Sequence, residues 1–157
     1  MLYVICGYPA SGKSTFCRKQ VADIPSAIVY DMDDLSAALT ADAPHAHRME
    51  QSIGRMLNDI AHMIEKSFGN YGIQDMFLIR MVPTNDEMNG YLAGSNEHVQ
   101  VLLMDTPKDV CLQRAQQRGD FDLYTFGKAC GKVDRFTSLY EDHIVRVSPH
   151  PFTLFSD

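Results

Sequence analysis

Runs of consecutive apolar residues alternate along the chain with segments in which apolar positions recur every three or four residues. These runs, of which the last is interrupted by Gln100, are typical of strands buried on both faces and cover residues 2–6, 27–30, 76–79 and 99–104. The segments predicted as helices, of which 46–67 is the longest amphipathic stretch, cover residues 15–21, 35–39, 46–67, 84–93, 106–118 and about 132–144. This alternation predicts βαβ units, and hence a parallel sheet with helices on both faces.

Between these segments the sequence predicts connections and a short tail. Residues 40–46 have the composition of a loop, and residues 120–131 are a mixed, glycine-containing stretch. Pro149 and Pro151 bracket the tail, where residues 152–155 are typical of a last short strand. No internal repeat is evident in the sequence, so we expect a single α/β domain with a mostly parallel sheet of four or five strands.

The composition is that of an ordinary globular protein, since 45% of the 157 residues are hydrophobic and 22% are charged. No apolar run approaches the length of a membrane span, and because the first strand begins at residue 2 we expect no targeting peptide. The cysteines lack zinc-binding or C-x-x-C spacing, which indicates buried, reduced thiols at Cys6, Cys17, Cys111 and Cys130. We therefore expect a cytoplasmic protein with no membrane partner.

The charge distribution argues against a broad nucleic-acid-binding face. The net charge is −6, whereas a surface that binds a polyanion is basic. Residues 1–106 carry 7 Lys and Arg against 13 Asp and Glu, but residues 107–157 carry 7 of each. The basic residues of the last third can therefore still gather around one phosphate site.

A glycine-rich motif lies between the first predicted strand and the first predicted helix. Residues 7–15, Gly-Tyr-Pro-Ala-Ser-Gly-Lys-Ser-Thr, match the phosphate-binding pattern G-x-x-x-x-G-K-[ST] at every fixed position. The glycines let backbone N–H groups turn inward around an anion, and the positive end of the helix dipole adds to the same site. The lysine supplies a charge for the β- and γ-phosphates, and the serine hydroxyl can ligate Mg²⁺. The motif predicts binding of ATP or another nucleoside triphosphate with Mg²⁺, through Gly7, Pro9, Ala10, Ser11, Gly12, Lys13, Ser14 and Thr15.

Three acidic residues, Asp31, Asp33 and Asp34, follow the second predicted strand. They lie at the carboxyl end of a parallel strand, on the same sheet edge as the glycine-rich motif. One aspartate suffices to cap the next helix, so the others are candidates for chemistry. A carboxylate at this edge can accept the proton of an acceptor hydroxyl or hold Mg²⁺ through water. We take Asp31 as a candidate metal residue and Asp34 as a candidate substrate contact.

Arg114 and Arg118 lie four residues apart on the helix predicted before Gly119, so they share one face of it. Phosphoryl transfer needs positive charge on the transferred group, which such a pair can supply. The glycine-containing stretch that follows can close over the site, which makes residues 107–135 an arginine-bearing helix and lid. The alternative is an exposed helix face that carries ordinary surface arginines.

Three segments are similar to those of a known family: the glycine-rich motif, D-M-D-D-L at residues 31–35, and D-T-P-K-D-V-C-L-Q-R-A-Q-Q-R-G at residues 105–119. They resemble the small P-loop kinases, particularly the kinase domain of phage polynucleotide kinase and the zeta-toxin-like group. The resemblance implies a three-layer αβα P-loop NTPase fold. It also implies that Asp33 activates the acceptor hydroxyl, and that Arg118 acts on the transferred phosphate together with Arg114.

Three positions depart from the pattern of that family. Met32 stands where the family usually has arginine, and Ser36 stands where polynucleotide kinase has an arginine that grips the substrate phosphate. Arg80 ends the third strand, where the family usually has an aspartate. Arg80 is a candidate phosphate contact, and the alternative is that it pairs with an acid of residues 31–34. The apolar-Arg-x-x-Pro run at residues 79–83 is similar to that of small phage-encoded P-loop proteins, so we expect a phage-encoded member.

Together these features predict an ATP-dependent phosphotransferase that moves the γ-phosphate to a hydroxyl acceptor, namely a nucleic-acid 5′ end, a nucleoside or another small molecule. One alternative is a nucleotide-binding accessory or regulatory ATPase without an acceptor, favoured by the missing acid after the third strand and by the acidic surface. Another alternative is a nucleoside monophosphate kinase, which needs more lid arginines than residues 120–132 contain.

Overall fold

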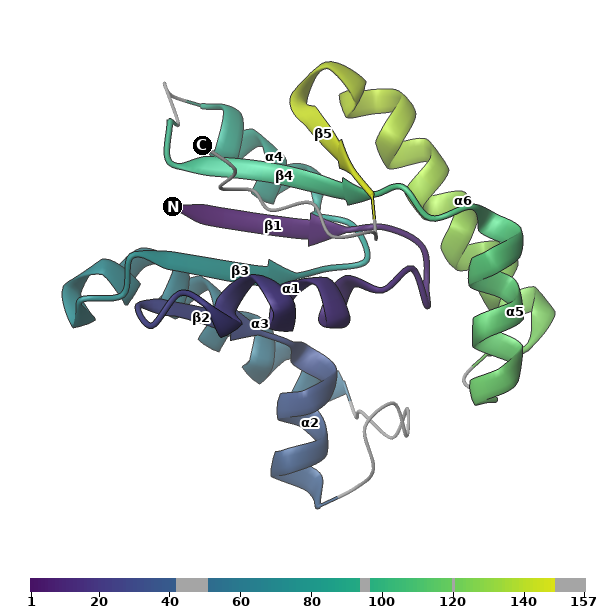
Figure 1. The fold of residues 1–157 in the computed structure, drawn as a ribbon, viewed down its shortest axis with the longest axis horizontal. Coiled ribbons are helices and arrows are strands. Elements are labelled where there is room, and N and C mark those ends of the chain that lie inside the picture. Colours follow the sequence, from purple (N-terminus) through teal and green to yellow (C-terminus); the bar gives the residue numbers. More distant parts are fainter. Residues whose placement is uncertain (42–50, 94–96, 120, 149–157) are drawn as a thin grey trace.

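The computed structural model describes residues 1–41, 51–93, 97–119 and 121–148, and its centre is a parallel sheet (Figure 1). The five strands lie in the order β2-β3-β1-β4-β5, and every neighbouring pair is parallel. Their bounds are β1 Leu2–Cys6, β2 Ala27–Tyr30, β3 Asp75–Ile79, β4 Val99–Met104 and β5 Ile144–Val147. Because all strands run the same way, the segments that follow them share one edge of the sheet.

Helices cover both faces of this sheet. One face packs against α3, α4 and α6 through Ala61, Met88 and Val133, and the other packs against α1 through Phe16 and Cys17. The predicted three-layer αβα arrangement is therefore confirmed. The helices are α1 Lys13–Ala22, α2 Met32–Thr40, α3 Gln51–Ser67, α4 Asn85–Leu92, α5 Lys108–Arg118 and α6 Leu123–Tyr140, with the 3-10 turns η1 Phe68–Tyr71 and η2 Glu141–His143.

Helix α6 begins earlier than the sequence pattern predicts. It starts at Leu123 rather than at about residue 132, so most of the stretch 120–131, predicted as an irregular lid, is the first half of a helix. The Asp122 side chain caps this helix, because it accepts a hydrogen bond of 2.7 Å from the backbone N–H of Thr125.

A buried stripe explains why the helix forms there. Phe126, Ala129, Cys130, Val133 and Phe136 are all buried on one side of α6. Two glycines, at positions 127 and 131, dilute the helical pattern in the sequence and cost about 1 kcal/mol each relative to alanine. Burial of two phenylalanines alone contributes about 3–6 kcal/mol, so tertiary packing outweighs the low helix propensity of the glycines.

The C-terminal end differs from the prediction as well. Helix α6 ends at Tyr140 and a 3-10 turn leads directly into β5, where the sequence pattern predicted a helix as far as residue 144. The strand predicted at residues 152–155 lies outside the described residues, as do residues 46–50 of the long predicted helix and most of the loop predicted at 40–46.

The expectations for the cysteines and for a membrane span can also be compared with the structure. All four cysteines are buried free thiols, as predicted. Within the described ranges, none of the helices has the combination of length and apolar character that crossing a membrane requires.

Candidate active site

The phosphate loop, residues 7–15, leads from the end of β1 into α1. Gly7 and Gly12 have φ angles of 145° and 95°, which residues with a side chain rarely adopt. A Cβ atom on Gly7 would lie only 3.1 Å from the Met104 Cβ and 3.1 Å from the Ser11 Oγ. The backbone conformation therefore explains why the motif has glycine at both fixed positions. At Gly7 the lack of space for a side chain is a second reason.

Neighbouring loops hold the phosphate loop in place. The Gly7 N–H donates a hydrogen bond of 3.1 Å to the Met81 carbonyl after β3, and the Thr106 hydroxyl after β4 donates one of 2.8 Å to the Ser11 carbonyl. The Ser11 Oγ is buried and has no hydrogen-bond partner among the described residues. An unsatisfied buried hydroxyl inside a glycine-bounded loop suits an incoming polar ligand, and an anion fits the N–H groups around it.

Lys13, the first residue of α1, folds back over the loop. Its ammonium group donates hydrogen bonds of 3.0 Å to the Gly7 carbonyl and 2.8 Å to the Tyr8 carbonyl. Burial lowers the pKa of Lys13 to about 8, although the negative charges of Asp33 and Asp31 raise it. A buried ammonium group that is compensated mainly by carbonyls is a strong attractor for a phosphate.

Ser14 and Asp31 are brought together, as the predicted metal site requires. The Ser14 hydroxyl donates a hydrogen bond of 2.7 Å to Asp31 Oδ2, while Asp31 Oδ1 accepts one of 3.1 Å from the Asp33 N–H and caps α2. A hydroxyl and a carboxylate are the hard oxygen donors that Mg²⁺ prefers. In the described part of the chain no group of three or more acidic, histidine or cysteine side chains can hold a metal, so phosphates and water would complete the coordination.

The other two acids of the cluster lie in the first turn of α2 but have different surroundings. Asp34 forms an ion pair of 2.7 Å with Arg18 of α1, and both side chains are largely exposed. Asp33 lies close enough to Lys13 for its charge to raise the pKa of that lysine. Of these two carboxylates, therefore, Asp33 is the one coupled to the phosphate loop.

Helix α5 carries the two predicted arginines and stands beyond the carboxyl ends of the strands (Figure 1). Arg114 Nη1 lies 3.5 Å from the Ala10 carbonyl and 4.0 Å from the place that a Cβ of Gly12 would occupy. The structure thus brings Arg114 to the phosphate loop. Arg118, the last residue of α5, follows one turn later on the same side of the helix.

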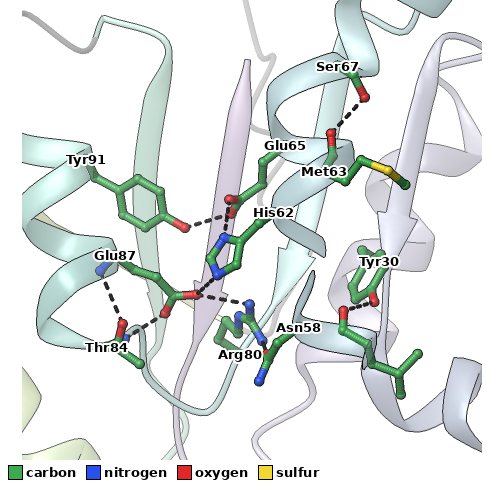
Figure 2. Close-up of polar contacts among 11 residues, drawn as sticks. Tyr30, Asn58, His62, Met63, Glu65, Ser67, Arg80, Thr84, Glu87 and Tyr91 are labelled. Atoms are coloured by element: carbon green, nitrogen blue, oxygen red, sulfur yellow. Dashed lines mark hydrogen bonds and ion pairs between the residues drawn. The ribbon is translucent and has the colours of Figure 1, made fainter. Parts of the chain in front are cut away.

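Arg80 has partners that the sequence did not indicate. Figure 2 shows it between α3 and α4, where it donates hydrogen bonds of 2.7 Å to the Asn58 side chain and 3.0 Å to Glu87. The alternative interpretation, an ion pair of Arg80 with an acid of residues 31–34, is wrong, because Glu87 supplies the carboxylate instead, and the phosphate contact stays a prediction. The Arg80 and Glu87 side chains are only 11% and 9% exposed, so this ion pair is largely buried.

Glu87 has two functions at once, which explains why the pair was missed. One of its oxygens accepts a hydrogen bond of 2.7 Å from the Thr84 N–H and completes the capping box of α4, while the other contacts Arg80. The pair continues into a polar network, because His62 lies 3.7 Å from Glu87 and 3.1 Å from Glu65 (Figure 2). Tyr91 closes the network with a hydrogen bond of 2.8 Å to Glu65.

Sequence reasoning also missed two residues around the side chain of Tyr8, namely Lys108 and Asp134. The Tyr8 hydroxyl donates a hydrogen bond of 2.5 Å to Asp134 of α6, and the Lys108 ammonium of α5 donates one of 2.8 Å to the same carboxylate. No local sequence pattern predicts this contact, because 126 positions separate Tyr8 from Asp134. The only available signal is that an aromatic residue occupies a variable position of the motif.

Comparison with known proteins gives one family and a shared fold. The family model described as AAA domain matches residues 2–125, whereas a comparison with curated proteins finds no match. Among solved structures, a chain of the Pnkp1/Rnl/Hen1 RNA repair complex is similar, with a TM-score of 0.69 and 15% identity. The similarity covers 99% of this chain and 51% of that one, so this chain spans about half its length.

Two further solved structures are similar over nearly their whole length. A shikimate kinase from Aquifex aeolicus has a TM-score of 0.59 at 15% identity, and the match covers 98% of this chain and 89% of that one. A deoxyadenosine kinase from M. mycoides with bound dATP has a TM-score of 0.53 at 11% identity, covering 98% and 93%. At such identities the likeness shows a common fold, here the P-loop kinase-like one.

Proposed function

Because the chain belongs to the AAA domain family, matched over residues 2–125, we propose that it is an ATP-dependent phosphotransferase. In the proposed reaction it moves the γ-phosphate of a nucleoside triphosphate to a hydroxyl acceptor. A nucleic-acid 5′ end, a nucleoside or another small molecule is the proposed acceptor class. The resemblance to polynucleotide kinase supports the first, and the similarity to a deoxyadenosine kinase and a shikimate kinase supports the others.

One observation carries this proposal, namely the hydrogen bond of 2.7 Å between Ser14 and Asp31. It joins the first turn of α1, where a triphosphate would bind, to the acidic first turn of α2. A loop that only stores nucleotide has no need of a carboxylate cluster at this point, whereas a transfer reaction needs a base beside the γ-phosphate. Asp33 lies two residues from Asp31 and is electrostatically coupled to Lys13.

The proposed roles follow from these positions. Lys13 leaves the two loop carbonyls and binds the β- and γ-phosphates, together with the loop N–H groups. Ser14 and Asp31 would hold Mg²⁺, which when bound neutralises phosphate charge and orients the γ-phosphate. Arg114 and Arg118 stabilise the charge that develops on the transferred group.

In the proposed transfer step, the Asp33 carboxylate is the base. The acceptor hydroxyl oxygen attacks the γ-phosphorus, and its proton passes to the Asp33 carboxylate. A new P–O bond forms to the acceptor while the bond from the γ-phosphorus to the bridging oxygen breaks, so ADP leaves with the electron pair. The proton on Asp33 then returns to solvent.

A panel of acceptors tests the proposal. Release of ADP by the purified protein is followed with Mg²⁺ and ATP, alone and with a 5′-hydroxyl oligonucleotide, a nucleoside, shikimate or a nucleoside monophosphate. The proposal expects one hydroxyl acceptor to accelerate ADP release at least about tenfold and to take up label from γ-labelled ATP. If no acceptor accelerates ADP release, the phosphotransferase assignment is overturned.

A second candidate is a nucleotide-binding accessory or regulatory ATPase, and the surroundings of Arg80 favour it. The acid that the family usually carries after the third strand is absent, and Glu87 nearby is neutralised by Arg80. Slow ADP release that is unaffected by every acceptor, together with a changed conformation on ATP binding, would support this candidate.

A further inference from the structure

Three side chains from separate elements meet at the phosphate loop, and we call them the Tyr8 anchor: Tyr8, Lys108 and Asp134. The Tyr8 hydroxyl and the Lys108 ammonium bond the two oxygens of Asp134 at 2.5 and 2.8 Å. The Lys108 ammonium also lies 5.2 Å from the centroid of the Tyr8 ring. The anchor thus connects the loop with α5, which stands beyond the carboxyl edge of the sheet, and with α6, which runs from beside α5 toward β5 (Figure 1).

Tyr8 links this anchor to the nucleotide-binding machinery through its main chain. Its carbonyl accepts the hydrogen bond of 2.8 Å from Lys13 and another of 3.2 Å from the Ser11 N–H. When Lys13 turns to a phosphate, the Tyr8 carbonyl loses its strongest partner. The Ser11 N–H bond remains on that carbonyl, and the bond to Asp134 is then the side-chain hydrogen bond that keeps Tyr8, and so the opening of the loop, in place.

The charges of the three anchor residues stabilise the hydrogen bond between Tyr8 and Asp134. Lys108 and Tyr8 hold the pKa of the Asp134 carboxyl below its usual range, so this group stays ionised. Burial and the neighbouring Asp134 raise the pKa of Tyr8, so its hydroxyl keeps the proton that it donates. The Tyr8 bond is therefore charge-assisted, the stronger kind of hydrogen bond.

The ion pair and the packing in this region do not explain the anchor by themselves. The Lys108 and Asp134 side chains are half-exposed, and an ion pair of that kind contributes little to stability. Helices α5 and α6 pack through a buried cluster made of Cys111, Ala115, Phe126 and Cys130, and the Tyr8 ring packs against that cluster, so packing holds the ring while the polar bond holds its hydroxyl end. The contact of Asp134 that reaches into the loop is its bond with Tyr8.

We propose that Asp134 is a positioning residue for the triphosphate, which acts through the Tyr8 hydroxyl to hold the phosphate loop in its binding conformation. Asp134 lies beyond residues 2–125, so the family match does not include it. The inference rests on the proposed binding of a triphosphate by residues 7–15. It adds helix α6 to the parts of the chain that determine nucleotide affinity.

Binding measurements on matched variants test this role. ATP and inorganic tripolyphosphate, each with Mg²⁺, are titrated by calorimetry into the full chain and into Tyr8→Phe, Asp134→Ala and the double variant. Tyr140→Phe is the control, because it removes a hydroxyl of the same helix that donates a hydrogen bond of 3.1 Å to Asn85, which follows Thr84 at the start of α4. Urea unfolding of each variant separates binding effects from stability.

The two single variants are expected to raise the Kd of both probes about five- to tenfold, and the double variant by no more than either single one. Equal effects on ATP and tripolyphosphate are expected, because the anchor contacts the phosphate loop and both probes carry the triphosphate that this loop would bind. Tyr140→Phe leaves both constants unchanged. If Asp134→Ala does not fold, the conservative Tyr8→Phe variant decides the question.

Two results would overturn the positioning role. One is tight binding by the parent chain with unchanged Kd values in Tyr8→Phe, and the other is multiplication of the two effects in the double variant. Failure of the parent chain to bind either probe is a different result, since it overturns the proposed nucleotide site itself.

Discussion

The Ser14 hydroxyl donates a hydrogen bond of 2.7 Å to Asp31, across 17 positions of the chain. The bond links the helix that follows the phosphate loop to the helix that follows β2. Because Asp31 also caps α2, it fixes the first turn of that helix, in which Asp33 and Asp34 lie. The positions of the proposed metal residue and of the proposed base are thus linked through one side chain.

This double role predicts the effect of Asp31→Asn. Asparagine caps a helix as well as aspartate does, so the free energy of unfolding changes by less than about 0.5 kcal/mol. The loss of the negative charge raises the Mg²⁺ concentration for half-maximal binding of an ATP analogue about tenfold. Mg²⁺ titrations monitor the binding, with Asp23→Asn at the other end of α1 as the control. An unchanged Mg²⁺ requirement would exclude Asp31 from the metal site.

The buried ammonium of Lys13 predicts a pH-dependent stability. Its pKa is lowered from 10.5 to about 8 by burial, so the ligand-free fold is destabilised by the charge at neutral pH. Lys13→Met is therefore expected to be more stable than the parent chain at pH 7, by at most about 3 kcal/mol. Between about pH 8 and 10.5 the unfolded chain binds a proton that the folded chain does not, so the parent chain gains stability relative to the variant.

Urea unfolding of both proteins at several pH values measures this difference. Burial raises the pKa of Cys6 and of Cys17 to about 12, so both thiols stay protonated in the folded parent chain up to pH 10, and loss of the lysine charge only raises these pKa values further. The difference in the free energy of unfolding between Lys13→Met and the parent chain should fall, by about pH 10, to less than half of its value at pH 7. ATP binding should be lost in Lys13→Met at every pH, whereas Lys19→Met, an exposed change on the same helix, should keep it.

The buried pair of Arg80 and Glu87 predicts a large loss of stability in Glu87→Ala. Removing the carboxylate leaves a guanidinium group that is only 11% exposed without its ionic partner, which costs about 3–5 kcal/mol. Asp86→Ala changes an exposed acid of the same helical turn and should cost less than about 1 kcal/mol. Urea unfolding measures both. Similar values for the two variants would show that the pair contributes nothing specific.

The two arginines of α5 are expected to act at different stages. Arg114 contacts the loop carbonyl of Ala10, so Arg114→Ala should weaken ATP binding as well as transfer. Arg118→Ala should slow transfer about a thousandfold and leave the Kd of ATP within about twofold. Gln117→Ala, an exposed neighbour, serves as the control in rate and binding assays. A normal transfer rate in Arg118→Ala would place that arginine outside the reaction.

The parts of the site that the sequence predicts are those encoded within short segments. The glycines, lysine and serine of the phosphate loop stand at fixed spacing, and their backbone requirements at Gly7 and Gly12 are local. The acids after β2 could be placed beside the loop because parallel strands share a carboxyl edge. Four of the strands were recognisable for a similar reason, since each is a short, almost wholly apolar run.

Contacts between distant segments could not be predicted in this way. Glu87 lies in the helix predicted over residues 84–93, but nothing in the sequence shows that its carboxylate meets Arg80. Asp134 contacts Tyr8 only because α6 folds across the loop. The same helix was placed too late in the chain, because two glycines weaken its apolar periodicity while burial of Phe126 and Phe136 favours it.

The most direct test of the account measures transfer of labelled γ-phosphate by Asp33→Asn beside Asp34→Asn. The first change removes the proposed base, and the second alters an acid that is paired with Arg18 and 41% exposed. With the best acceptor of the panel, Asp33→Asn should bind ATP within about twofold of the parent chain but transfer phosphate about 10²- to 10⁴-fold more slowly. Asp34→Asn should keep most of the rate. Transfer at the parent rate in Asp33→Asn would contradict the account.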